Sequence, residues 1–264
     1  LTMILDELKF NGDTRGIRVI QTQRGVVDDS DPYSQWNLCH YTGDAAQRVF
    51  DARLELCRQL GIGYDHLIMP RQTHSTNVFV INESFLEVPT AFKITSLNEI
   101  DGLVTNLPGI CIGVNTADCV PIALADTTCG VIAIAHAGWR GTVAGIAKKT
   151  LTAMSMLGAN PENILATMGV SICQDCFEVG DEVVAEFENA GFDMSLIMHR
   201  NATTGKAHIN LQEANRQVLI AAGVPQGNIA LPEHCSRCES DRYFSARRLG
   251  INSGRTFTGI IMQN

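Results

Sequence analysis

The sequence predicts an α+β fold, in which mixed β-sheets are packed between helices in one domain spanning residues 1–264. Hydrophobic residues make up 45% of the chain, close to the roughly 45–50% of globular domains, so material for a core is ample. Short β-rich segments outnumber helical ones, and several follow each other with only a turn between them. The strict alternation of strand and helix that builds a doubly wound parallel sheet is therefore missing.

Four segments carry the apolar spacing of amphipathic helices, and each ends directly before a glycine that can adopt a left-handed conformation. A proline shortly after the last of these segments strengthens its end. The predicted helices are Asp44–Leu60, Thr142–Leu157, Asp181–Ala190 and Gln212–Ala222.

Seven short segments rich in β-branched and apolar residues are predicted to be strands. Some are apolar throughout, which is typical of a strand whose sheet is covered on both faces. The predicted strands are Ile17–Gln21, Val78–Ile81, Ile110–Val114, Val120–Leu124, Gly130–Ala135, Ile164–Met168 and Phe257–Met262.

The charge balance excludes two classes of partner. Lys and Arg number 20 against 28 Asp and Glu, which gives a formal charge of −8. An acidic surface repels phosphate backbones and anionic bilayers, so we expect neither nucleic-acid nor membrane binding. The longest apolar runs are also far shorter than the roughly 20 residues that span a bilayer. The sequence sets no oligomeric state.

The first residues and the cysteines together indicate a compartment. The N-terminal segment lacks a basic stretch and soon reaches Asp6 and Glu7, so no secretory signal is predicted. The nine cysteines are an odd number spread over the whole chain. We therefore expect a cytoplasmic protein whose cysteines are reduced and available for metal binding or catalysis.

The densest group of chemically active residues lies between Thr116 and Gly145. A predicted strand leads into His136, a glycine-rich turn and a helix start, which presents backbone N–H groups and a positive helix end to an anion. Arg140 adds a planar, permanent cation suited to phosphate or carboxylate. The same residues also fit a tight turn with a solvated arginine, and spacing alone does not choose between the two interpretations.

Cys119 and His136 are expected to converge at one sheet edge, because only a short connection separates the strands beside them. His74 is a third candidate. Two imidazoles and one thiolate form the ligand set of a catalytic zinc with one open position, and the set also suits copper. Spacing does not require this site, because a single loop histidine or a single small buried cysteine is common.

Two Cys-x-x-Cys elements, Cys173–Cys176 and Cys235–Cys238, form a second set. Four thiolates could bind a structural zinc ion. The gap between the elements, however, is far longer than the roughly 15–20 residues of a compact zinc ribbon. Neither element opens a helix in the way a redox dithiol does. We interpret them as reduced, partly buried thiols, with a Cys₄ zinc site as the alternative.

Six motifs occur in an order that resembles a known family, the YfiH/laccase-domain family. This family is described as multicopper polyphenol oxidoreductase and also as purine nucleoside phosphorylase. The resemblance runs from Arg24 to the C-terminus and so covers nearly the whole chain. The motifs are Q-T-H from Gln72, D-G-L-V-T from Asp101, T-A-D-C-V-P from Thr116, H-A-G-W-R-G from His136, F-E-V-G from Phe177 and Y-F-S-A-R-R from Tyr243.

The resemblance implies a zinc ion bound by His74, Cys119 and His136. It also implies phosphorolysis of adenosine, inosine and methylthioadenosine, together with deamination of adenosine, so the expected partners are a purine nucleoside and phosphate. It carries over Asn37 and Arg247 as candidate substrate contacts, and Gln72 and Arg140, which lie in its motifs, are two further candidates. Val170 and Leu249 replace a proline and an aspartate that are usual in the family. These two departures bear on substrate preference and leave the three ligands intact.

The hypothesis is that the metal activates water for deamination and, with Arg140, holds phosphate for phosphorolysis. Asp118 is either a proton carrier or a turn residue. Three alternatives stay open: a Cys–His hydrolase in which Cys119 attacks an amide, a copper-dependent polyphenol oxidase, and a module that binds nucleoside without turnover. A four-copper cluster needs paired His-x-His elements, which the sequence lacks.

Overall fold

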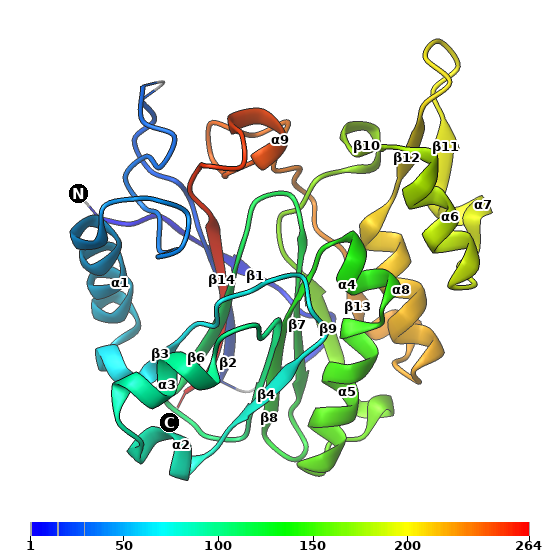
Figure 1. The fold of residues 1–264 in the computed structure, drawn as a ribbon. Helices are drawn as coiled ribbons and strands as arrows, with labels where there is room; N and C mark the ends of the chain where they lie inside the picture. The colour runs from blue at the N-terminus through cyan, green and yellow to red at the C-terminus, as the bar shows by residue number, and fades with distance from the viewer. Residues whose placement is uncertain (1, 15, 29, 264) are drawn as a thin grey trace.

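Two large β-sheets form the centre of the protein, and helices cover their outer faces (Figure 1). The structure is a computed structural model that describes residues 2–14, 16–28 and 30–263. Parallel and antiparallel strand pairs occur in both large sheets. This confirms the predicted α+β class with mixed sheets between helices.

The described strands are grouped in three sheets. The first has the order β1 (Leu5–Leu8), β2 (Ile17–Thr22), β14 (Thr256–Met262), β6 (Cys111–Thr116) and β3 (Leu67–Ile68). The second has the order β13 (Ile229–Ala230), β9 (Leu165–Met168), β7 (Val120–Asp126), β8 (Val131–Ala137), β5 (Gly102–Thr105) and β4 (Val78–Ile81). The third has the order β10 (Glu178–Val179), β12 (Ala207–Ile209) and β11 (Met198–Arg200).

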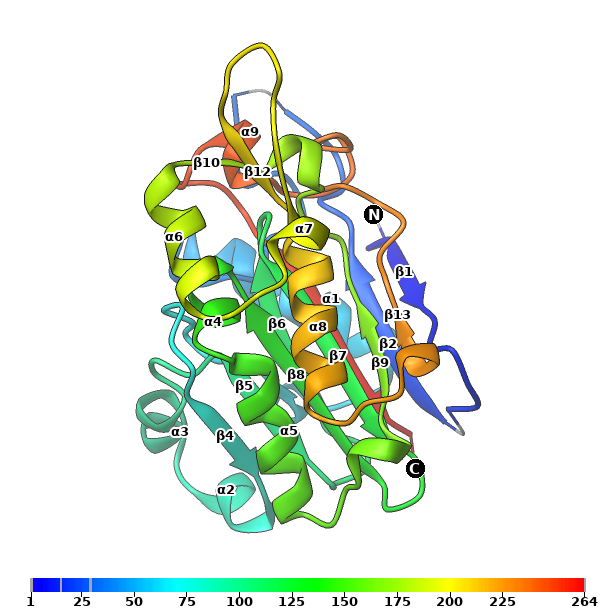
Figure 2. The same cartoon turned by 90° about the vertical axis from the view of Figure 1, so that its right-hand side faces the viewer.

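The helices pack on opposite sides of the two large sheets. Helix α1 lies against the first sheet, and α5 and α8 lie against the second (Figures 1 and 2). The α-helices are α1 (Ala46–Leu60), α2 (Glu83–Glu87), α3 (Thr90–Ser96), α4 (Trp139–Val143), α5 (Ile146–Met156), α6 (Asp181–Asn189), α7 (Met194–Ile197), α8 (Leu211–Ala221) and α9 (Ala246–Leu249). The 3₁₀ turns are Tyr64–His66, Pro161–Asn163, Gln174–Cys176 and Gln226–Asn228.

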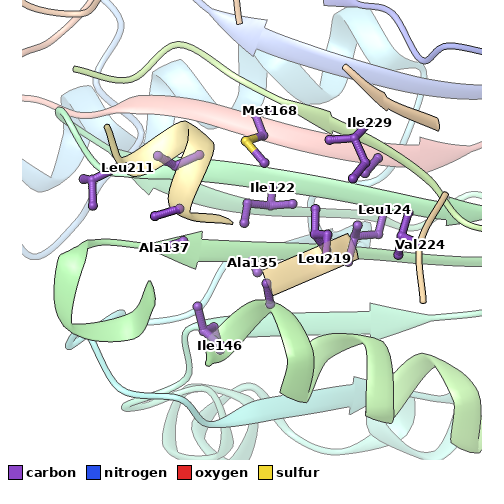
Figure 3. Packing of buried hydrophobic residues seen from close by; sticks show 14 of the residues in the cluster. Ile122, Leu124, Ala135, Ala137, Ile146, Met168, Leu211, Leu219, Val224 and Ile229 are labelled. Carbon is purple, nitrogen blue, oxygen red and sulfur yellow. The ribbon is translucent and has the colours of Figure 1, made fainter. Parts of the chain in front are cut away.

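Strand β8 shows how the alternation of side chains builds two separate cores. Ala133 and Ala135 pack toward α5 and α8, in the cluster that Figure 3 shows from close by. Ile132 and Ile134 pack instead with residues of the first sheet. Because successive side chains of a strand point to opposite faces, His136 continues the row that faces the first sheet. The end of this strand therefore directs an imidazole into the space between the sheets.

The predicted strands are all found, and each of their ends lies within two residues of the prediction. The helices predicted at 44–60, 181–190 and 212–222 are confirmed as α1, α6 and α8. The prediction of one continuous helix over Thr142–Leu157 is wrong. Gly145 has a φ of +79°, so α4 ends at Val143 and α5 begins at Ile146.

In the described part of the chain, the structure contains no helix that is both long enough and apolar enough to cross a membrane.

Candidate metal centre

Three side chains from distant parts of the sequence meet where β7 begins and β8 ends. Cys119 directly precedes β7, and His136 lies in β8, which pairs with β7 along its whole length. His74 comes from the loop between β3 and β4. The ligand atoms of the three residues lie within 4.8 Å of one another. Cys119 Sγ is 3.7 Å from His74 Nε2, and the two imidazole centroids are 4.8 Å apart.

A buried carboxylate, Asp101, positions two of these three residues. Its Oδ1 accepts a hydrogen bond of 2.7 Å from His136 Nδ1 and one of 3.1 Å from the backbone N–H of His74. Its Oδ2 accepts from the backbone of Thr73 at 3.1 Å and from the backbone and hydroxyl of Ser75, both at 2.8 Å. One carboxylate therefore fixes the ring of His136 and the whole turn that carries His74.

The backbone of His74 needs this support. His74 has a φ of +62°, a left-handed conformation that side chains other than glycine rarely adopt and that costs of order 1–2 kcal/mol. The three N–H groups that donate to Asp101 belong to His74 and to the residues on either side of it, Thr73 and Ser75. Their hydrogen bonds hold the turn in a conformation that points the imidazole at Cys119.

Gly138 leaves the space in which the ligands meet. A Cβ atom at this position would lie 2.7 Å from His74 Cδ2 and 2.9 Å from Cys119 Sγ. Gly141, one helical turn further on, would place a Cβ in ordinary contact, with its nearest neighbour at 3.4 Å. The first glycine of the H-A-G-W-R-G motif is thus required because the side chains of His74 and Cys119 come so close to it. Its φ of −72° is one that any residue can adopt, so the backbone conformation does not require glycine.

The centre is open on one side. His136 is 4% exposed, Cys119 is partly exposed and His74 is exposed. Cavities of about 620 and 660 Å³ lie elsewhere, one beside α1 and α3 and the other beside β1. The exposure of His74 and the partial exposure of Cys119 make the centre accessible from the protein surface.

The electrostatics of the centre favour a thiolate. Burial raises the pKa of Cys119, but the positive charge of His136 and hydrogen bonds from both imidazoles outweigh it and lower this pKa to about 6. Burial lowers the pKa of His136, but the Cys119 thiolate and the Asp101 carboxylate raise it to about 9. Burial raises the pKa of Asp101, yet its hydrogen bonds from His136 and Ser75 bring it below its usual value. A thiolate is the form of cysteine that binds metal.

These residues fit a zinc ion. One thiolate sulfur and two imidazole nitrogens match the three-ligand sets that leave a fourth position open. Since Asp101 accepts from Nδ1 of His136, the Nε2 atom of that ring is the one left for a metal. A carboxylate bonded to the far nitrogen of a ligand histidine is the arrangement that fixes ring orientation in zinc sites.

Asp118 has both carboxylate oxygens occupied. Oδ1 accepts from the hydroxyl of Ser236 and Oδ2 from the backbone N–H of Arg247, each at 2.7 Å. Its backbone oxygen accepts from the N–H of Ile172 at 2.9 Å. Asp118 also has a φ of +87°. Its contacts join three segments around the residue that precedes Cys119.

The two arginines among the candidate substrate contacts are exposed. Arg140 stacks over the ring of Trp139, with its Cζ 4.2 Å from the ring centroid. Within the described residues, no carboxylate forms an ion pair with Arg140. Arg247 lies over the ring of Phe177, and its Nη1 donates to the carbonyl of Glu178 at 3.0 Å.

The two amides are buried and bonded within the protein. Asn37 donates to the carbonyl of Cys39 and to Asp44, and it accepts from the backbone of Arg255. Gln72 bonds both backbone groups of Asn115 and accepts from the hydroxyl of Tyr41. In this structure the two side chains hold loops together beside β6 and α1.

The sequence reasoning missed the role of Asp101, which appeared only as the first residue of a motif. The available signal was an acidic residue directly before an apolar segment, Gly102–Thr105, which was not itself predicted to be a strand. Since Gly102 pairs with Ala135 across the sheet, Asp101 lies beside His136.

Comparisons with known proteins show which sequences and folds this chain resembles. Adenosine deaminase RL5, from an unknown prokaryotic organism, is 57% identical over 97% of this chain and 98% of its own length. A purine nucleoside phosphorylase of Bacteroides thetaiotaomicron is 41% identical over 92% of this chain and 90% of its own. The crystal structure of YlmD from Geobacillus stearothermophilus superposes with a TM-score of 0.85 at 28% identity, over 94% of this chain and 93% of that one.

A second solved structure, of the Bacillus licheniformis hypothetical protein YfiH, has a TM-score of 0.84 at 26% identity, over 94% of this chain and 93% of that one. The family described as multi-copper polyphenol oxidoreductase laccase matches residues 18–263, nearly the whole sequence. The chain therefore belongs to this family, as its six motifs indicated.

Proposed function

We propose that this chain is a zinc-dependent enzyme that acts on purine nucleosides, by phosphorolysis of adenosine, inosine and methylthioadenosine and by deamination of adenosine. The observation that carries the proposal is the set of His74, Cys119 and His136, with its ligand atoms within 4.8 Å and an exposed side. The names of two relatives, adenosine deaminase and purine nucleoside phosphorylase, support the substrate class.

In this proposal the two imidazoles and the thiolate of Cys119 hold the ion. A zinc ion bound there supplies a Lewis acid that can activate water or polarise a phosphate oxygen. Asp101 keeps His136 and the turn of His74 in place before substrate arrives, so little reorganisation accompanies the reaction. Glycine at position 138 keeps the approach to the three ligand atoms clear.

The arginines bind the anionic partner. Arg140 is exposed in the first turn of α4, and a planar guanidinium can donate two parallel hydrogen bonds to phosphate. The backbone N–H of Arg247 donates to the carboxylate of Asp118, the residue next to Cys119, and this bond fixes the position of Arg247. Asn37 and Gln72 contribute by holding the surrounding loops.

The experiment measures metal content and nucleoside turnover on one purified sample. Adenosine with phosphate should yield adenine and ribose 1-phosphate, and adenosine alone should yield inosine. Cys119→Ala should lose one equivalent of zinc and both activities. Cys129→Ala is the matched control, because Cys129 is exposed and lies in the turn between β7 and β8, at the opposite end of β7 from Cys119. Full zinc content and turnover in Cys119→Ala would contradict the proposal.

A Cys–His hydrolase is the second candidate, because the lowered pKa of Cys119 and the raised pKa of His136 also describe a nucleophilic thiolate and its base. Chelation separates the two candidates. The metal enzyme loses activity in chelator and regains it with zinc, whereas a thiol nucleophile keeps its activity in chelator and loses it on alkylation. Elemental analysis of the same sample distinguishes zinc from copper.

A further inference from the structure

A second group of metal-binding side chains lies outside the candidate centre. Cys173 and Cys176 belong to the loop between β9 and β10, and Cys235 and Cys238 follow β13. The two elements are 62 positions apart, yet all four sulfur atoms lie within 4.8 Å of one another. The long separation in the sequence argued against a shared site, but the fold brings the two elements together.

Backbone pairing explains why the two elements meet. Ser171 and Cys235 form a parallel bridge, and the N–H of Ser236 donates to the carbonyl of Ser171 at 3.1 Å. This pairing places the two Cys-x-x-Cys elements side by side. It extends the contact between β9 and β13, which are parallel neighbours in the second sheet.

Each element is a turn that brings its two sulfurs to the same side. In the first, the N–H of Cys176 donates to the carbonyl of Cys173 at 3.1 Å. In the second, the N–H of Glu239 donates to the carbonyl of Cys235 at 3.0 Å. The N–H of Cys173 also points at the sulfur of Cys235, at 3.3 Å. Backbone N–H groups directed at sulfur stabilise a thiolate by charge-assisted hydrogen bonding.

The spacing of the sulfurs suits one tetrahedral ion. Zinc–sulfur bonds of about 2.3 Å place neighbouring sulfurs of a tetrahedron about 3.8 Å apart. Cys176 Sγ and Cys238 Sγ are 3.5 Å apart, and each of the four sulfurs is near all the others. Two separate disulfides would require only that the sulfurs meet in pairs, whereas a single ion requires all four to converge.

The charge around the group is also complementary. A zinc ion with four thiolates carries a net charge of −2. Arg237, between the cysteines of the second element, directs its Nη1 at the sulfur of Cys176 from 3.5 Å. This guanidinium offsets part of the negative charge. Cys176 and Cys235 are buried and Cys238 is exposed, so the group lies at the surface, where an ion can enter.

We propose that Cys173, Cys176, Cys235 and Cys238 bind one structural zinc ion, separate from the centre of His74, Cys119 and His136. Four protein ligands leave no open position, which is typical of a structural site.

The ion would fasten two segments around Asp118. The N–H of Ile172, next to Cys173, donates to the backbone oxygen of Asp118, and the hydroxyl of Ser236, next to Cys235, donates to its carboxylate. The two elements therefore hold the residue that precedes Cys119 from two directions. A metal that joins them sets the position of the loop entering the candidate centre.

The decisive sample is the full chain with Cys119→Ala, which removes a ligand of the other centre. We expect it to retain one equivalent of zinc, and X-ray absorption at the zinc edge should show four sulfur neighbours at about 2.3 Å. The unsubstituted protein should hold two equivalents. Adding Cys176→Ser and Cys238→Ser to Cys119→Ala should remove the remaining zinc, and adding Cys129→Ser instead should not.

Three outcomes would overturn the proposal: a Cys119→Ala protein free of zinc, a zinc shell with nitrogen or oxygen neighbours, or a mass measurement showing that the four cysteines form disulfides. The absorption measurement needs no change at the four cysteines, so it holds even where their replacement prevents folding. It also needs no catalytic assay, so a failure of the proposed function would leave this result unchanged.

Discussion

At the scale of single residues, the candidate centre depends on groups that are not ligands. Asp101 binds one imidazole and three consecutive backbone N–H groups, and Gly138 clears the space in which the ligand atoms meet. Neither residue belongs to the set of His74, Cys119 and His136 that the ligand types predicted. The geometry of the ligands is thus set by their neighbours as much as by their own identity.

Asp101→Asn tests this dependence. The amide keeps the size of the side chain but removes the charge that orients His136, and losses of this kind cost about 10–100-fold in metal affinity. We expect a fall of that size at the site that is lost in Cys119→Ala, measured by competition with a chromophoric chelator.

Asp126→Asn is the matched control. Asp126 is also buried and also accepts backbone N–H groups, from Thr128 and Asn160, but it lies at the far end of β7. Its replacement should leave zinc affinity unchanged. Equal losses in both variants would show that Asp101 acts only through general stability.

The sequence predicted part of this site and not the rest, for a physical reason. Cys119 and His136 were expected to converge because they flank a strand pair with a short connection, a local feature. His74 was a third candidate that spacing did not require and that the resemblance implied as a ligand, and Asp101 was not assigned a role. The contact of Asp101 with His136 depends on the pairing between β5 and β8. The backbone conformation of His74 depends on Asp101. Such contacts arise only when distant segments meet.

At the scale of elements, patterns that repeat over many residues predicted the helices and strands correctly. The exception is a place where one residue interrupts a regular pattern. Helix α1 ends at Gly61 in a left-handed conformation, as its sequence indicates. The periodicity of 142–157 is also helical, yet Gly145 divides it into the two helices α4 and α5. Strands of only two residues, such as β3 and β13, carry too little pattern to be recognised.

Helix α1 makes the stability of the protein sensitive to acid. Glu55 accepts hydrogen bonds from Arg58 at 2.9 Å and from Gln59 at 2.8 Å, and the bond from Arg58 is the largest cause that lowers its pKa to about 2. A carboxyl whose pKa is lowered on folding contributes stability above its unfolded value of about 4.5, and this contribution disappears as the pH falls toward 2.

Glu55→Gln should therefore cost about 1 kcal/mol at neutral pH and flatten the loss of stability between pH 4.5 and 2, measured by urea denaturation. Arg58→Gln should reproduce part of the effect, because it removes the main cause. An acid limb in Glu55→Gln as steep as in the unsubstituted protein would contradict the assignment.

At the scale of the whole molecule, stability rests on the contact between the two large sheets. Ile134 of β8 is fully buried and packs in the cluster that contains residues of the first sheet, including Ile112 and Ile260. The sequence indicated strands buried on both faces, and the structure shows why. One face of β8 meets a sheet and the other meets helices. Which sheet a strand joins, however, depends on long-range pairing that composition and periodicity do not encode.

Ile134→Ala should destabilise the protein by about 2–5 kcal/mol, because it removes a buried side chain from between two rigid layers and leaves a cavity. Ile94→Ala is the control, because Ile94 is 66% exposed and its loss should change stability by less than about 0.5 kcal/mol. Urea denaturation at fixed zinc concentration measures both. A similar midpoint for the two variants would place the main core elsewhere.

The position of β14 has a consequence for how the protein is made. This strand, Thr256–Met262, lies between β2 and β6 in the first sheet, so residues near the two ends of the described chain are direct neighbours. A ribosome that has released only the first two hundred residues exposes β2 and β6 without the strand that joins them. The layer that faces α1 can close only after translation has passed Met262, and until then its apolar edges are open to chaperones or to aggregation.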